Sequence, residues 1–264
     1  MGLLDDLKHE ADSLREKQQA SEAEFNQNLL AAHAKLQDAL RYWLDFFKAL
    51  KVINPRVPRY YYLEGGGSKL DDLQQCDYNV NAQRLTIDHY DYIEAVEVRF
   101  RCAAEGSLTL EKESDPMVRR LRDHLWANNL KFDVKEVRNE RGYVERGIFT
   151  VKREVPVTIT IAANRDNAQI RIVIRNLEKL GEYVYVYDFD EFGTDVLEEL
   201  GKVIVARPNA LRTLGRHQQA MTAPATRAAQ SPAAAPPPAA LASVNDAGNA
   251  ATGPLGSLKS RLTR

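Results

Sequence analysis

The stretch FNQNLLAAHAKLQDALRYWLDFFKALKVI, residues 25–53, carries the clearest structural pattern of the chain. Nine apolar residues follow one another here at steps of four and three: Phe25, Leu29, Ala32, Leu36, Ala39, Trp43, Phe46, Leu50 and Ile53. This spacing places all of them along one side of an α-helix. Ser21 and Glu24 have the spacing of a capping box, and Asn54-Pro55 is typical of a helix end. We therefore predict a long amphipathic helix from about Ser21 to Ile53.

The apolar side of this helix has two interpretations. It packs in the core of its own domain, or it forms a coiled coil with a second subunit and makes a homo-oligomer. The residues that carry either role are Phe25, Leu29, Leu36, Trp43, Phe46 and Leu50. The preceding positions in the same frame, Glu22, Gln18 and Arg15, are polar, so the heptad pattern does not extend upstream. This favours core packing.

A first helical segment is predicted over residues 1–17. Its apolar side carries Leu3, Leu4, Leu7, Ala11 and Leu14. The polar residues 15–24 that follow are either a solvated continuation of the helix or a turn between two helices. Residues 1–55 thus form an N-terminal helical segment.

Composition describes an ordinary soluble globular protein. The chain has 264 residues, of which 44% are hydrophobic and 28% are charged. It contains no apolar run long enough to cross a membrane, and its first residues lack the pattern of a signal peptide, so we expect a cytoplasmic protein. The two cysteines, Cys76 and Cys102, provide neither a disulfide framework nor a paired metal spacing. We predict no metal and no cofactor.

Charge is unevenly distributed along the chain. Residues 1–215 hold 31 basic and 36 acidic side chains, whereas residues 216–264 hold 5 basic and 1 acidic. An acidic body makes nucleic acid an improbable partner, because nucleic-acid binding usually needs a basic face.

Beyond residue 55 the periodicity changes to alternation. Val96, Val98, Phe100 and Cys102 share one face of a strand, which makes Cys102 a core thiol. Gly106 is predicted to turn the chain into another strand, and Pro156 to mark a sheet edge. Further strands are predicted at 84–90, 132–138, 143–153, 155–161, 170–175 and 183–187, and helices at 115–127 and 190–200. Residues 56–215 therefore form an α+β domain, an antiparallel sheet with helices on one side.

Several short motifs contain residue types that are common in binding sites. Glu64-Gly65-Gly66-Gly67-Ser68-Lys69 lacks the spacing of a phosphate-binding loop, so we predict a turn capped by Ser68 before a short helix. Residues 188–199 resemble a calcium loop, but Phe192 stands where an oxygen ligand is needed. Arg119, Arg120 and Arg122 form a solvated helix face or grip a phosphate or carboxylate.

An aromatic strand offers an alternative binding face. Tyr183, Tyr185 and Tyr187 lie at every second position, and a neighbouring strand carries Arg171 and Arg175. Stacking on aromatic rings beside basic residues is how sheets bind single-stranded nucleic acid. No ribonucleoprotein motif accompanies these residues, so the face remains the alternative.

The C-terminal part is built differently. Residues 216–254 are rich in Ala and Pro and are predicted to be a disordered linker. Residues 255–264 form a candidate docking peptide for another protein, with Leu255, Leu258, Lys259, Arg261, Leu262 and Arg264 as its contact residues. The alternative is an end without a function of its own.

No catalytic signature is found in the sequence. We therefore predict a non-enzymatic, cytoplasmic interaction, scaffold or adaptor protein that presents its C-terminal peptide to an unidentified protein partner. The alternative is a sheet domain that binds single-stranded nucleic acid or a small ligand, and a further alternative is an enzyme of unrecognised type.

Overall fold

α1 (Leu3–Ile53) is one continuous helix in the computed structural model, which describes residues 2–64, 67–214 and 216–218. The predicted end is confirmed: Asn54 adopts a φ of +43°, and its N–H donates to the Leu50 carbonyl at 2.8 Å. The predicted start near Ser21 is wrong, because Ser21 lies inside the helix. Residues 15–24 are mostly Arg, Lys, Glu, Gln and Ala, which favour helix, so the polar stretch is a solvated continuation.

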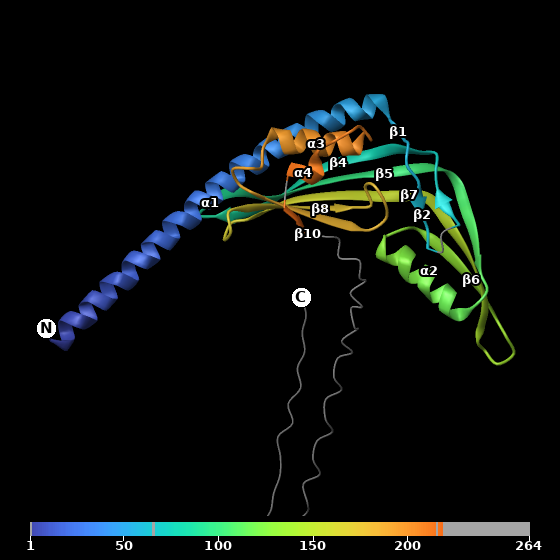
Figure 1. The fold of residues 1–264 in the computed structure, drawn as a ribbon, viewed down its shortest axis with the longest axis horizontal. Helices are drawn as coiled ribbons and strands as arrows, with labels where there is room; N and C mark the ends of the chain where they lie inside the picture. Colours follow the sequence, from blue (N-terminus) through green and yellow to red (C-terminus); the bar gives the residue numbers. More distant parts are fainter. Residues whose placement is uncertain (1, 65–66, 215, 219–264) are drawn as a thin grey trace, which may run out of the picture. The chain divides into compact units, whose positions relative to one another are not determined.

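An antiparallel sheet follows the helix and confirms the α+β class (Figure 1). Its order is β1-β4-β5-β7-β8-β9-β10, with β6 pairing with β7. The strands are β1 (Arg56–Val57), β4 (Leu73–Ile87), β5 (Tyr90–Lys112), β6 (Phe132–Arg138), β7 (Val144–Asn164), β8 (Gln169–Arg175), β9 (Glu182–Asp188) and β10 (Arg216–Gln218). A separate pair consists of β2 (Tyr61–Tyr62) and β3 (Lys69–Leu70), and the other helices are α2 (Asp115–Ala127), α3 (Thr194–Ile204) and α4 (Leu211–Leu214).

Three strands are longer than predicted: β4 begins at Leu73 and not at residue 84, and β5 and β7 continue through predicted interruptions. β5 continues through Gly106, which has a φ of +85° at a register shift between Ala103 and Ser107. Gly106 therefore lies in a β-bulge and not in a turn, and its positive φ is one that glycine adopts without strain. β7 likewise continues through Pro156, so the predicted strands 143–153 and 155–161 are one.

Pro156 is tolerated because β7 is locally an edge strand there. One side of β7 pairs with β5, while the other pairs with β6 over residues 144–151 and with β8 over residues 158–164. Residues 152–157 of β7 lie between these two pairings. Asn176 bridges this gap, because its buried amide donates to the carbonyls of Pro156 (3.1 Å) and Asn128 (2.9 Å). A single side chain thus replaces strand pairing at this point.

The second half of α1 and all of α3 cover one face of the sheet (Figure 1). Trp43 and Phe47 are buried in the same cluster as Val98, Phe100 and Cys102 of β5, and the Phe47 and Phe100 rings lie 5.9 Å apart. α2 packs on β7 at Gly147, where a Cβ would stand 2.7 Å from Val118. The helices therefore anchor on rows of alternating apolar residues, as predicted.

Three local predictions are wrong. Ser68 precedes β3 and not a helix, since Leu70 pairs with Tyr61. The helix predicted at 190–200 starts later: α3 begins at Thr194, after the buried Phe192 and the N-cap residue Gly193. The predicted linker starts too early, because residues 216–218 form β10 on β9. The described residues all belong to one compact unit, and residues 225–264 lie outside the described residues.

Candidate functional site

α1 leaves the sheet between Leu29 and Phe25. Leu29 is 5% exposed, whereas Phe25 is 40% exposed, and the Arg165 guanidinium lies 5.6 Å from the centroid of its ring. Asn28 donates to the Arg165 carbonyl at 2.9 Å. From residue 7 to residue 27 every side chain except that of Ser13 is exposed. Figure 1 shows this part of the helix extending beyond the strands, and we call residues 7–27 the projecting arm.

Most of the predicted apolar seam lies in the core of the chain itself. Leu29, Leu36, Trp43 and Leu50 are buried, and the last three belong to the cluster that α1 forms with the sheet. Between Trp43 and Leu50 the buried residue is Phe47, which is 2% exposed. The predicted seam residue, Phe46, is half-buried and packs towards α3. An α-helix turns once in 3.6 residues, so a repeat of 3.5 drifts around it and shifts the buried position by one.

The projecting arm carries a continuation of the same apolar row. Leu7 and Leu14 are 53% and 55% exposed. They lie seven residues apart, and Phe25 follows Leu14 by eleven, which correspond to about two and three helical turns. All three therefore share the side of α1 that is buried from Leu29 onwards. Where the sheet ends, this side of the helix is uncovered: it carries Leu7 and Leu14, and between Leu14 and Phe25 it carries the polar residues Gln18, Ser21 and Glu22.

The sequence predicts an apolar side with Leu7 and Leu14 for residues 1–17, but not that this side is aligned with the buried row. The frame extended upstream from Phe25 meets Glu22, Gln18 and Arg15, whereas Leu7 and Leu14 belong to a frame shifted by one residue. The signal that would have shown this alignment is the eleven-residue spacing between Leu14 and Phe25.

The arm is not stabilised by strong contacts of its own. The ion pair within it joins Arg15 to Asp12 at 3.5 Å, with side chains 75% and 66% exposed. Such an exposed pair contributes at most about 1 kcal/mol. The arm is helical because it continues a helix that is nucleated and held by the core.

The tyrosines and arginines of the alternative binding face lie on opposite faces of the sheet. Tyr185 and Tyr187 are buried under α3 and α4, and Tyr183 is half-buried beside them. Burial raises the pKa of Tyr187 to about 12. Arg171 and Arg175 alternate with the buried isoleucines of β8, so they face away from the tyrosines. The structure does not bring these five residues together.

The uncovered sheet face holds a polar groove of about 830 Å³. Arg99, Arg101 and Arg175 line it, and each is ion-paired within the chain. Arg99 contacts Glu97 at 2.7 Å, Arg101 contacts Glu154 at 2.8 Å, and Arg175 contacts Glu182 at 3.2 Å. The positive charge of these three arginines is therefore compensated within the chain.

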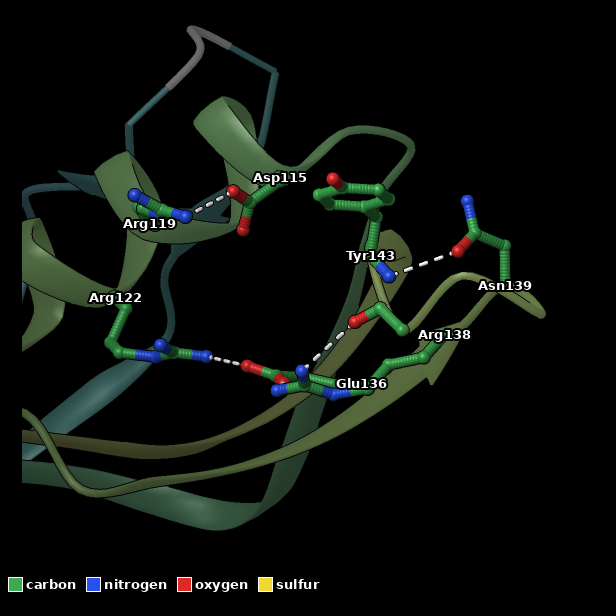
Figure 2. A network of polar contacts seen from close by, with 8 residues as sticks. Asp115, Arg119, Arg122, Glu136, Arg138, Asn139 and Tyr143 are labelled. Atoms are coloured by element: carbon green, nitrogen blue, oxygen red, sulfur yellow. Dashed lines mark hydrogen bonds and ion pairs between the residues drawn. The ribbon is translucent and has the colours of Figure 1, made fainter.

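The three arginines of α2 are also ion-paired. Arg119 contacts Asp115 of its own helix, Arg120 contacts Glu64 at 3.2 Å, and Arg122 contacts Glu136 of β6. Figure 2 shows that Glu136 is shared, because Arg138 of the same strand also reaches it and donates to the Gly142 carbonyl at 3.1 Å. These hydrogen bonds, first that of Arg122, lower the pKa of Glu136. Of the three, Arg122 ties α2 to the β6–β7 hairpin.

A shallow pocket of about 560 Å³ lies beside this network. Glu64, Asp123 and His124 are among its lining residues. Burial lowers the pKa of His124, and its Nε2 atom has no hydrogen-bond partner within the described residues. The pocket mixes both signs of charge, so it has no preference for an anion or a cation.

Cys102 is confirmed as a core thiol. It is 1% exposed, and burial raises its pKa to about 11, so the thiol is protonated at neutral pH. Neither Cys102 nor Cys76 is in a disulfide. Among the residues that the structure describes, no group of three or more His, Cys, Asp or Glu side chains is placed to hold a metal ion.

The predicted docking peptide, Leu255, Leu258, Lys259, Arg261, Leu262 and Arg264, lies outside the described residues. None of the described helices is long and apolar enough to cross a membrane. Comparison of the chain with protein families, curated proteins and solved structures found no match.

Proposed function

We propose that this chain is a non-enzymatic, cytoplasmic protein-interaction protein of the adaptor type, in which the projecting arm binds another protein. One observation carries the proposal: a helix firmly held by the core continues through residues 7–27 with its side chains exposed, and its apolar row is uncovered there. A preformed amphipathic helix is a common recognition element, laid into a groove or against another helix.

Anchoring makes the arm suited to this role. An isolated helix of this length is only marginally stable in water. The arm extends from the buried part of α1, so its nucleation cost is met by the core. A partner therefore meets a helix that is already ordered, which lowers the entropy lost on binding.

The C-terminal peptide is proposed as a second contact. Its sequence supports this, because Leu255, Leu258 and Leu262 are spaced by three and four residues among basic ones. The free thiols Cys76 and Cys102 suit a reducing compartment such as the cytoplasm.

Affinity capture with charged substitutions tests the arm. In Leu7→Asp/Leu14→Asp, we expect partner recovery to fall while the melting temperature of the body is unchanged, because both side chains are exposed. Leu30→Asp/Leu44→Asp is the matched control, since Leu30 and Leu44 are exposed to a similar degree (59% and 51%) away from the apolar row. Equal loss in both variants, or no loss in either, would overturn the role of the arm.

The same experiment separates the two contacts. Leu258→Asp/Leu262→Asp changes only the tail, so any partner lost here and retained in the arm variant belongs to the peptide. If this variant recovers the same partners as the wild type, the tail is not a docking segment.

A further inference from the structure

The N–H group of Ile93 donates a hydrogen bond to a histidine ring of α1. The acceptor is Nδ1 of His33, at 3.0 Å. The bond joins β5 to the helix one turn beyond the point where α1 meets the sheet. Ile93 is 4% exposed, so this N–H has no ready access to water.

A β-bulge explains why this N–H needs a partner from outside the strands. On β4, Gln83 pairs with Ala95 of β5, but the next residue, Arg84, pairs with Ile93. Glu94 is therefore an extra residue in β5, and the hydrogen-bond ladder is interrupted beside it. A buried backbone N–H without an acceptor is unfavourable, and His33 supplies that acceptor.

The bond requires one protonation state of His33. An imidazole nitrogen accepts a hydrogen bond only when it carries no proton, so Nδ1 must be bare and the proton must sit on Nε2. When the ring becomes positively charged, both nitrogens carry protons, and Nδ1–H then points at the N–H of Ile93. Histidine is the side chain whose charge changes between about pH 5 and pH 8.

We propose that His33 is a pH-sensitive latch: its hydrogen bond with Ile93 holds α1 on the sheet at the first helical turn that the sheet covers. With a neutral ring the latch is closed, and the arm starts near Phe25. With a charged ring the bond to Ile93 is lost, and the helix loosens from the sheet around Leu29 and Ala32. The arm then becomes longer, so its reach depends on pH.

The charged groups around the latch are few. The ring of His33 meets that of Tyr92 edge-on, with centroids 5.6 Å apart. On the turn between β7 and β8, Arg165 contacts α1 at Asn28 and is paired with Glu94 of β5 at 3.3 Å. On β4, Arg84 is the strand neighbour of Ile93. Within α1, Lys35 is engaged elsewhere, donating to the Phe192 carbonyl at 2.7 Å. Glu94 is thus paired with Arg165.

Amide hydrogen exchange of the full chain tests the latch. We measure the protection factor of the Ile93 amide between pH 8 and pH 5, with the Val98 amide of the same strand as reference. In the wild type we expect Ile93 protection to fall by about tenfold at the acid end, as for the loss of one hydrogen bond, while that of Val98 holds. An Ile93 amide that stays protected at pH 5 overturns the proposal.

Two substitutions distinguish a latch from a purely structural histidine. His33→Asn places an amide oxygen near the position of Nδ1, so it accepts the same bond but has no charge to gain. In this variant we expect Ile93 protection that is independent of pH. His33→Ala should lack the extra protection throughout the range. If His33→Asn loses protection in acid as the wild type does, another group is responsible and the latch is wrong.

Discussion

Gly201 of α3 lies directly against Tyr42 of α1: a Cβ built on the glycine would stand 2.8 Å from the tyrosine hydroxyl oxygen and 3.3 Å from the Phe46 ring. Both helices are held at this distance because position 201 has no side chain. Alanine normally stabilises the interior of a helix by about 1 kcal/mol relative to glycine. Here the contact reverses that sign.

We therefore expect Gly201→Ala to destabilise the chain by about 1–3 kcal/mol, the usual cost of overpacking. Tyr42→Phe removes the hydroxyl group that the new methyl group meets. The double variant should recover part of the loss in denaturant unfolding. Purely additive effects of the two changes would contradict close packing of α1 on α3.

The adjacent residues Phe46 and Phe47 should differ in their contribution to stability. Phe47 is 2% exposed and packs on Tyr78 and Phe100, with ring centroids 4.9 and 5.9 Å away. Phe47→Ala should cost about 3–5 kcal/mol, as for other buried aromatic side chains. Phe46→Ala should cost less, because this ring is only half-buried. Thermal unfolding of the two variants, compared at equal concentration, measures the difference, and the reverse order would place the wrong residue in the core.

Removal of the glycine at the β5 bulge should have a small effect. A Cβ at Gly106 would meet nothing within 4 Å, but the φ of +85° is strained for any other residue. We expect Gly106→Ala to cost about 1 kcal/mol from backbone strain alone. Gly147→Ala is the contrasting variant, because its Cβ would stand 2.7 Å from Val118, so it should cost more and loosen α2. Proteolysis at α2 reports that loosening.

The Glu136 network should give stability that depends on pH. Hydrogen bonds from Arg122 and Arg138 lower the pKa of Glu136 in the folded chain. A carboxylate with a lowered pKa in the folded state stabilises at neutral pH, and this contribution is lost as the pH falls below the ordinary glutamate range towards the lowered value. The melting temperature of Glu136→Gln should lie below that of the wild type at pH 7, and the two should converge in acid.

The control for this network is Glu140→Gln, at an exposed position in the turn of the same hairpin. It should shift the melting temperature little at either pH. If the difference in melting temperature between the wild type and Glu136→Gln is the same at pH 7 and pH 3, the ion pairs do not cause it.

Much of the fold is readable from local patterns. The alternation from Val96 to Cys102 and the helix at 115–127 both rest on short-range patterns, and both are confirmed. The rule that Gly and Pro interrupt elements failed at Gly106 and Pro156. Both residues lie in long strands whose pairing partners change at those positions, and pairing across the sheet is not visible in one sequence.

The candidate site was less predictable. The seam indicated a buried helix but not where its burial stops, since the end of the sheet near Arg165 is a tertiary property. The prediction of a binding face formed by tyrosines and arginines failed for a related reason. Spacing by two assigns Tyr183, Tyr185 and Tyr187 to one face, but it does not say that α3 covers that face.

The break in strand pairing along one side of β7 has a mechanical consequence. The β6–α2 part and the β8–β9 part pair with different stretches of the same side of β7, and between them the amide of Asn176 donates to the carbonyls of Pro156 and Asn128. A force that twists one part against the other therefore meets two hydrogen bonds there instead of a ladder. We expect the sheet to be stiff along β5 and β7 and compliant across Pro156, so that the α2 end bends under load before either part unfolds.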